Sequence, residues 1–237
     1  MWSCACASSN PGPRSYGKPA RLFQRFAVAL FVACVAWAPA VAQQAAERPV
    51  KIVALGDSLM SGFQLPASAA FPAQLERALR AKGLAVEVAN AGVSGDTASG
   101  GLARLDWSVP EGTEAVIVEL GANDMLRGVE PKVTRAALEK IIQRLKARGI
   151  EVLLCGMLAP PNLGPEYARA FNAIYADLAS AHELLFYPFF LDGIAVDPKF
   201  NQRDGLHPTA AGVTAIVARI VPKAEELVAR VRAKRGS

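Results

Sequence analysis

The residues whose types could carry out chemistry fall into four short polar clusters, and the first is Gly56-Asp57-Ser58. Ser58 follows the apolar run 50–55, so its hydroxyl is expected at the end of a strand. A serine hydroxyl becomes a nucleophile when a base removes its proton, and that base needs a third group to orient it. Serine after glycine and aspartate is also ordinary turn chemistry, so the tripeptide alone does not separate a nucleophile from a turn residue.

His182 and His207 are the chain's two histidines and therefore the candidates for that base. His182 lies late in an expected helix, where the helix dipole favours a solvated cation, so we interpret it as a helix-end residue. Asp204 precedes His207 by three residues, a spacing that in a tight turn brings a carboxylate to one imidazole nitrogen while the other faces outward. A capped helix start explains the same spacing equally well, because Pro208 is expected to begin the last helix.

Acyl transfer also requires hydrogen-bond donors, because negative charge develops on the carbonyl oxygen. Gly95 lies in the glycine-rich segment 90–101, where the missing Cβ lets a backbone N–H approach a substrate. Asn123 follows Gly121 at the end of another apolar run and offers a side-chain NH2 group. The Ser58 N–H is a third donor if a helix begins there. Taken singly, each of these is also a common loop residue.

Strand-like and helix-like segments alternate along the chain and must position these clusters. Short apolar runs predict buried strands at 50–55, 84–90, 115–120, 150–156 and 184–190. Helical periodicity predicts helices over 71–83, 131–149, 165–182 and 208–234, the last kinked near Pro222. Apolar strands separated by helices indicate an α/β fold, a three-layer α/β/α sandwich with a parallel sheet of about five strands. We expect one domain from 48 to 235, with all four clusters on the rim where such sheets bind ligands.

The first 42 residues differ in composition from the rest of the chain. They have no acid, an apolar run over 26–42 that ends in Ala-Val-Ala, and four basic residues, namely Arg14, Lys18, Arg21 and Arg25. This pattern predicts a signal peptide over 1–42 that is cleaved near Ala42, and hence a periplasmic or secreted protein. About 12 strongly apolar residues before Pro39 are too few for a membrane anchor. A lipoprotein cysteine at Cys34 is disfavoured because the residues before it fit a lipobox poorly.

Removal of this leader changes the charge and the cysteine content. The whole chain has 26 basic and 21 acidic residues, and 22 basic residues remain without the leader. The basic pI of 9.2 therefore gives no indication of a nucleic-acid partner. Of the four cysteines only Cys155 remains, and its apolar surroundings in the sequence predict a buried, inert strand thiol.

Taken together, the four clusters resemble the conserved blocks of the SGNH or GDSL-type hydrolases. The matching segments are ALGDSLMSGF, NAGVSGDTASGGLARL, VIVELGANDMLRG and DGLHPTAAG, which run from about residue 52 to residue 212. The chain is most similar to the subgroup of bacterial exported arylesterases, acyl-CoA thioesterases I and lysophospholipases L1. The resemblance implies a flavodoxin-like sheet and a serine esterase that acts on acyl esters and thioesters.

The resemblance also implies a role for each matching residue. Ser58 matches the nucleophile, His207 the general base and Asp204 its orienter, while the Ser58 N–H, Gly95 and Asn123 match the oxyanion donors. Hydrolysis in the family needs no metal and no organic cofactor. We expect a monomer with a small-molecule acyl ester or thioester substrate, membrane lipids as a potential source of that substrate, and no nucleic-acid partner. We assign structural roles in bracing the loops to the three other aspartates of the four clusters, namely Asp57, Asp96 and Asp124.

Other functions on the same fold fit the sequence less well than a serine esterase. Neither GxxxxGK[ST] nor GxGxxG follows the first strand, and Met60 replaces the second glycine of a GxSxG elbow. A carbohydrate-ester deacetylase is the main alternative, followed by a non-catalytic lipid- or glycan-binding protein. Met125, Leu126 and the segment 158–161 either line an acyl groove or pack in the core.

Overall fold

A parallel five-stranded sheet forms the centre of the structure, in the strand order β2-β1-β3-β4-β5. The computed structural model describes Gly12 and residues 48–236, so the predicted leader lies almost entirely outside the described residues. The strands are β1 (Val50–Gly56), β2 (Val86–Gly92), β3 (Ala115–Glu119), β4 (Glu151–Cys155) and β5 (Leu185–Tyr187). The predicted α/β fold with a parallel five-stranded sheet is confirmed. β5 is shorter than predicted and ends before Pro188, which has no N–H for the ladder.

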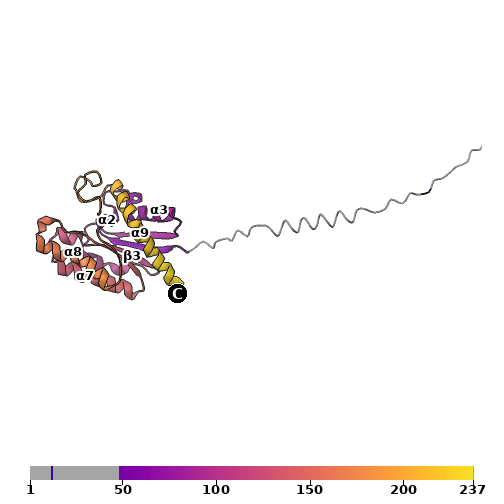
Figure 1. Ribbon diagram of the computed structural model, residues 1–237, viewed down its shortest axis with the longest axis horizontal. Helices are drawn as coiled ribbons and strands as arrows, with labels where there is room; N and C mark the ends of the chain where they lie inside the picture. The colour runs from indigo at the N-terminus through magenta and orange to yellow at the C-terminus, as the bar shows by residue number, and fades with distance from the viewer. Residues whose placement is uncertain (1–11, 13–47, 237) are drawn as a thin grey trace, which may run out of the picture. The chain divides into compact units, whose positions relative to one another are not determined.

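Long helices cover both faces of this sheet, as Figure 1 shows. α3 (Phe71–Ala81) and α9 (Ala210–Arg235) lie on one face, and α7 (Pro131–Ala147) and α8 (Pro165–Ala181) lie on the other. Their buried faces are rich in leucine, isoleucine and valine, which pack against β1, β3 and β4, the strands buried on both sides. The predicted three-layer arrangement is therefore confirmed. The prediction of a fully buried strand at 84–90 is wrong, because β2 lies at the edge of the sheet and alternates between buried Val86 and Val88 and exposed Glu87 and Ala89.

The start of α9 differs from the prediction. The helix begins at Ala210, because Thr209 is its N-cap and the Thr209 hydroxyl accepts a hydrogen bond from the Gly212 N–H at 3.2 Å. Pro208 lies outside the helix in an isolated bridge to Asn201. The helix continues through Pro222 as a single element.

Several short helices follow the strands and were not predicted. They are α2 (Ser58–Ser61), α4 (Ala98–Ala103), α5 (Leu105–Ser108) and α6 (Ala122–Leu126), with 3-10 turns η1 (Ala67–Ala69) and η2 (Pro161–Leu163). Helices of four to six residues show no hydrophobic period, so a sequence pattern does not reveal them. They matter here because α2, α4 and α6 are the first helices after β1, β2 and β3, and the polar clusters of the sequence occur at these junctions.

The strand order places β1 between β2 and β3, so the chain reverses its direction of winding at β1. In open parallel sheets this switch point, at the carboxyl ends of the strands, is where ligands bind. Cys155, at the end of β4, is 1 % exposed, and burial raises the pKa of its thiol well above the ordinary value. The prediction of a buried strand thiol is confirmed. No helix among the described residues is long and apolar enough to cross a membrane.

Candidate active site

Ser58 is the first residue of α2, and only Asp57 separates it from the end of β1. The Asp57 side chain caps this helix by accepting a hydrogen bond from the Leu59 N–H at 3.0 Å. The Ser58 residue is 9 % exposed, so its hydroxyl lies at a covered strand end. His207 Nε2 is 2.9 Å from Ser58 Oγ, although the two residues are 149 positions apart in the chain.

Asp204 holds the other side of the His207 ring. Its Oδ2 is 2.7 Å from His207 Nδ1, and its Oδ1 accepts the backbone N–H groups of Leu206 at 2.9 Å and His207 at 3.0 Å. The hydrogen bonds from the His207 N–H and then the Leu206 N–H lower the pKa of Asp204 to about 2. The carboxylate is therefore an acceptor at neutral pH, so His207 Nδ1 carries its proton and the Nε2 lone pair faces the serine hydroxyl.

Asp204 thus closes a tight turn around His207, as the first sequence interpretation expected. The alternative of a helix cap is wrong, because Thr209 caps α9 instead. His182 is not brought to this site: it is the C-cap of α8, and its Nε2 lies 3.7 Å from a Glu139 oxygen. Its predicted position at a helix end is confirmed, although its side chain is only 18 % exposed.

Two residues that the sequence did not single out also support His207. The ring of Phe63 packs on the imidazole with 4.4 Å between ring centroids and a tilt of 36°. Gln202 Nε2 donates to the carbonyl oxygens of Phe63 and Pro208, both at 2.9 Å. These contacts tie the loop before α9 to the segment after α2. A lone phenylalanine and a lone glutamine give no sequence signal for such a role.

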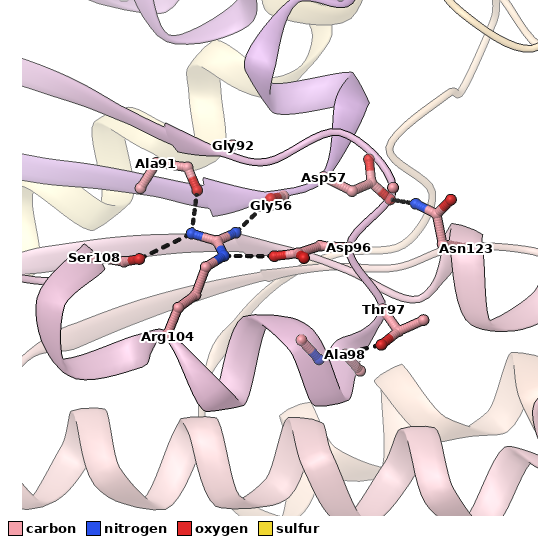
Figure 2. A network of polar contacts seen from close by, with 12 residues as sticks. Gly56, Asp57, Ala91, Gly92, Asp96, Thr97, Ala98, Arg104, Ser108 and Asn123 are labelled. Carbon is pink, nitrogen blue, oxygen red and sulfur yellow. Dashed lines mark hydrogen bonds and ion pairs between the residues drawn. The ribbon is translucent and has the colours of Figure 1, made fainter.

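Asn123 lies at the start of α6, after Gly121, whose φ of +118° is open to glycine but not to bulky residues. Asn123 Nδ2 donates to Asp57 Oδ2 at 3.0 Å, as Figure 2 shows. An amide nitrogen has two hydrogens, so this bond fixes the side chain and leaves one hydrogen for a ligand. The Asp57 carboxylate therefore connects the turn of Ser58 to the side chain of Asn123.

The loop with Gly95 lies against the helix that begins with Ser58. Ser94 Oγ is 3.0 Å from Ser61 Oγ, at the other end of α2. Gly95 itself has a φ of +86°, and its carbonyl accepts a hydrogen bond from Arg127 Nη2 at 2.7 Å. The loops after β1, β2 and β3 are thus joined at one end of the sheet.

A buried arginine, Arg104, holds two of these loops together in a way the sequence did not reveal (Figure 2). Its Nη2 donates to the Gly56 carbonyl and its Nη1 to the Ala91 carbonyl, both at 2.8 Å. Its Nε forms an ion pair with Asp96, next to Gly95. Arginine is rarely buried, so its residue type alone gives no indication of this role. The role of Asp96 in bracing its loop is confirmed.

The other two acidic residues also brace loops, as predicted. Asp124 is fully buried and accepts hydrogen bonds from the Ala98 N–H at 2.7 Å and the Thr134 hydroxyl at 2.9 Å. Asp57 is also fully buried, and burial raises its pKa to about 6 against the lowering effect of its hydrogen bonds.

A small cavity of about 100 Å³ opens beside Ser58, Asn123 and His207. Its remaining walls are apolar side chains, namely Leu59, Ala122, Met125, Leu126, Met157, Leu191 and Leu206. Met125 and Leu126 thus line the site, while in the segment 158–161 Leu158 is 44 % exposed and Ala159 is buried. Among residues 48–236 no group of three or more histidine, cysteine or acidic side chains is arranged to hold a metal ion.

Comparison with known proteins is consistent with this geometry. Residues 54–215 match the model of the GDSL-like Lipase/Acylhydrolase family. An arylesterase of Vibrio mimicus is 42% identical over 168 residues, which cover 70% of this chain and 82% of the relative. Thioesterase 1/protease 1/lysophospholipase L1 of Escherichia coli K12 is 42% identical over 158 residues, 66% of this chain and 74% of the relative.

Solved structures resemble the chain as well. The crystal structure of AlinE4, an SGNH-hydrolase family esterase, matches with a TM-score of 0.65 and 43% sequence identity. The match covers 76% of this chain and 96% of AlinE4. The likeness therefore extends over almost the whole of a solved esterase domain.

Proposed function

The chain belongs to the GDSL-like lipase/acylhydrolase family, and from this premise we propose that it hydrolyses acyl esters through an acyl-enzyme formed on Ser58. It is a carboxylic-ester hydrolase, as its named relatives are. One observation carries the assignment of the residues. His207 lies between Ser58 Oγ at 2.9 Å and Asp204 Oδ2 at 2.7 Å, which is the order nucleophile, base and orienting group.

In the first half of the reaction, Ser58 Oγ attacks the acyl carbonyl carbon while His207 Nε2 takes the hydroxyl proton. The carbonyl oxygen becomes an oxyanion that the Ser58 N–H, the Gly95 N–H and the Asn123 side chain stabilise. Asp204 stays ionised and stabilises the imidazolium. Collapse of the tetrahedral intermediate breaks the bond to the leaving oxygen or sulfur, which receives the proton from His207.

In the second half, water attacks the Ser58 ester and His207 takes its proton. The same three donors stabilise the second oxyanion, and its collapse returns the proton to Ser58 Oγ and releases the carboxylic acid. Each step uses the same His207 nitrogen, first as a base and then as an acid. The reaction thus leaves the enzyme unchanged after one molecule of water has been consumed.

The walls of the site support the proposed substrate class. The apolar side chains of Met125, Leu126 and Leu206 favour an acyl chain over a polar sugar, which ranks acyl esters above the carbohydrate-ester alternative. We extend the proposal to thioesters and lysophospholipids, because a relative at 42% identity is named for both activities. Membrane lipids would then be one source of substrate.

The protein is proposed to act outside the cytoplasm, after cleavage of residues 1–42, on the basis of the basic and apolar pattern of that segment. A monomer suffices for the reaction, since Ser58, Gly95, Asn123, Asp204 and His207 come from one chain. N-terminal sequencing of the exported protein tests the cleavage, and size-exclusion chromatography with light scattering tests the monomer.

The decisive experiment is hydrolysis of p-nitrophenyl esters of graded chain length by the wild type and by Ser58→Ala. We expect turnover in the wild type and its loss in the variant by a factor of about 10⁴–10⁶, because the Ser58 hydroxyl is the one that contacts His207 Nε2 among residues 48–236. Acyl-CoA and lysophospholipid substrates, assayed with the same pair, test the extension. Retained ester hydrolysis in the variant would refute the role of Ser58, and binding of esters without turnover in the wild type would refute the enzyme.

A further inference from the structure

Glu119, the last residue of β3, is a buried acid that the proposed reaction does not use. The residue is 1 % exposed, and neither of its carboxylate oxygens has a hydrogen-bond partner among the described residues. It pairs in register with Gly56, and a Cβ on that glycine would lie 2.8 Å from Glu119 Oε2. The carboxyl group is therefore packed against the chain immediately before Asp57 and Ser58.

A buried carboxylate without donors is unfavourable by several kcal/mol, so such a group takes up a proton. Glu119 has a second reason to be neutral, because Asp57, which is equally buried, is close enough for its charge to raise the pKa of Glu119. An ionised carboxylate has acceptor atoms but no donor, so no hydrogen bond can form between the two side chains while both are ionised. With one proton between them, the same contact becomes a hydrogen bond.

The donors around the pair decide which carboxyl holds the proton. Asp57 accepts the Leu59 N–H and the Asn123 amide, each at 3.0 Å. Within residues 48–236, neither Glu119 oxygen has a partner in hydrogen-bond geometry, and the Asp57 N–H is the one donor that lowers the pKa of Glu119. Hydrogen bonds to the charged form favour ionisation, so the negative charge belongs on Asp57 and the proton on Glu119. Burial, followed by the charge of Asp57, raises the pKa of Glu119 well above its ordinary value, in agreement with this placement.

The other titratable groups near Glu119 are neutral. They are Cys155 at the end of β4 and Tyr175 on α8, and for both burial is the main cause of a raised pKa, with Glu119 the next. Tyr175 donates its hydroxyl hydrogen to the Leu120 carbonyl at 3.0 Å, so it has no hydrogen left for Glu119. Asp57 is then the acceptor for the Glu119 proton.

We propose that Glu119 is a positioning residue whose neutral carboxyl donates a hydrogen bond to Asp57 and thereby fixes the Asn123 amide for the oxyanion. The order of contacts is Glu119 to Asp57, Asp57 to Asn123, and Asn123 to the substrate. The buried Asp57 carboxylate accepts hydrogen bonds from the Leu59 N–H and the Asn123 amide, and Glu119 supplies a third donor. The last of these contacts rests on the proposed function, whereas the protonation of Glu119 does not.

Two substitutions separate the donated hydrogen from the bulk of the side chain. Glu119→Gln keeps an N–H donor of nearly the same shape, so we expect kcat within about threefold of the wild type. Glu119→Met keeps the volume but removes the donor, so we expect kcat to fall about 10- to 100-fold with KM changed less than twofold, because the loss concerns only the transition state. The matched control is Leu138→Ala, a core change on α7, which we expect to lower the melting temperature and leave kcat unchanged.

Infrared spectroscopy of the resting enzyme tests the proton directly and without substrate. At slightly alkaline pH the wild type should show the C=O band of a buried carboxylic acid, and Glu119→Gln should lack it. The proposal is overturned if that band is absent from the wild type or persists in the variant. It is also overturned if Glu119→Met has the kcat of the wild type, or if kcat falls as far in Glu119→Gln as in Glu119→Met. Failure of the esterase proposal itself would appear separately, as activity retained in Ser58→Ala.

Discussion

Arg104 offers the sharpest test of how the loops around Ser58 are held together. Its guanidinium donates to the Gly56 and Ala91 carbonyls and pairs with Asp96, and its side chain is only 7 % exposed. Replacement by methionine keeps the apolar stem and removes every donor. The Asp96 carboxylate, 19 % exposed, would then be a largely buried charge without its cation.

The magnitude follows from that unpaired charge. Removing one partner of a buried ion pair costs about 3–5 kcal/mol, which is a large part of the roughly 5–15 kcal/mol that stabilises a typical domain. For a domain of this size, 1 kcal/mol corresponds to about 2–4 °C in the melting temperature, so Arg104→Met should melt about 6–20 °C below the wild type. Because Arg104 also fixes the strand end before Ser58, we expect kcat to fall about tenfold or more at a temperature where the variant is folded.

Calorimetry and p-nitrophenyl ester kinetics measure both effects. The matched control is Arg144→Met, which breaks an exposed ion pair with Asp106 and should cost less than about 1 kcal/mol. Adding Asp96→Asn to Arg104→Met should recover part of the lost stability, because the second change removes the unpaired charge. An unchanged melting temperature in Arg104→Met, or a double variant less stable than the sum of the single changes, would refute the reasoning.

Three further predictions concern the residues around Ser58. Asn123→Ala should lower kcat by about 10²–10³ with KM nearly constant in ester kinetics, and an effect on KM alone would contradict its role as an oxyanion donor. Asp204→Asn should lower kcat by about 10²–10⁴, because an amide no longer fixes the His207 tautomer. A kcat near that of the wild type in the same assay would contradict the role of Asp204 in orienting His207. For Asp57, burial raises the pKa to about 6 in the folded protein from 3.8, so the folded state binds the proton more tightly. Its contribution to stability is fully present below about pH 4 and is lost as the pH rises through about 6, about 3 kcal/mol in all. In urea denaturation, the free energy of unfolding of Asp57→Asn should therefore rise relative to that of the wild type between about pH 4 and pH 7. A difference in unfolding free energy that does not change with pH would exclude this linkage.

The sheet and the long helices could be predicted because their signals extend over many residues. Buried parallel strands are apolar runs, and α7 keeps its helical period over seventeen residues. The boundaries were less certain, since they depend on single contacts. The last helix begins at Ala210 because the Thr209 hydroxyl accepts one N–H, and nothing in the pattern ranks Thr209 above Pro208 as the boundary.

The candidate site was predictable to the extent that its residues stand in recognisable motifs. Ser58, Asn123 and His207 each follow a strand or precede a helix in a short polar cluster, so the fold predicts their common edge. Arg104 and Glu119 lie outside this reasoning, because their roles depend on burial and on partners far away in the sequence. Arginine and glutamate are residue types that are mostly exposed, so only the packed strands and loops reveal that Arg104 and Glu119 are buried.

The proposal that Ser58 is the nucleophile is tested most directly by covalent labelling with a fluorophosphonate. The serine oxygen would attack phosphorus, fluoride would leave, and the hydroxyl proton would pass to His207. Mass spectrometry of the intact protein and of its peptides should show one phosphonate per chain, attached to Ser58, with loss of ester hydrolysis in proportion to labelling. Ser58→Ala should remain unlabelled. Labelling at another residue, or full activity in the labelled enzyme, would contradict the assignment.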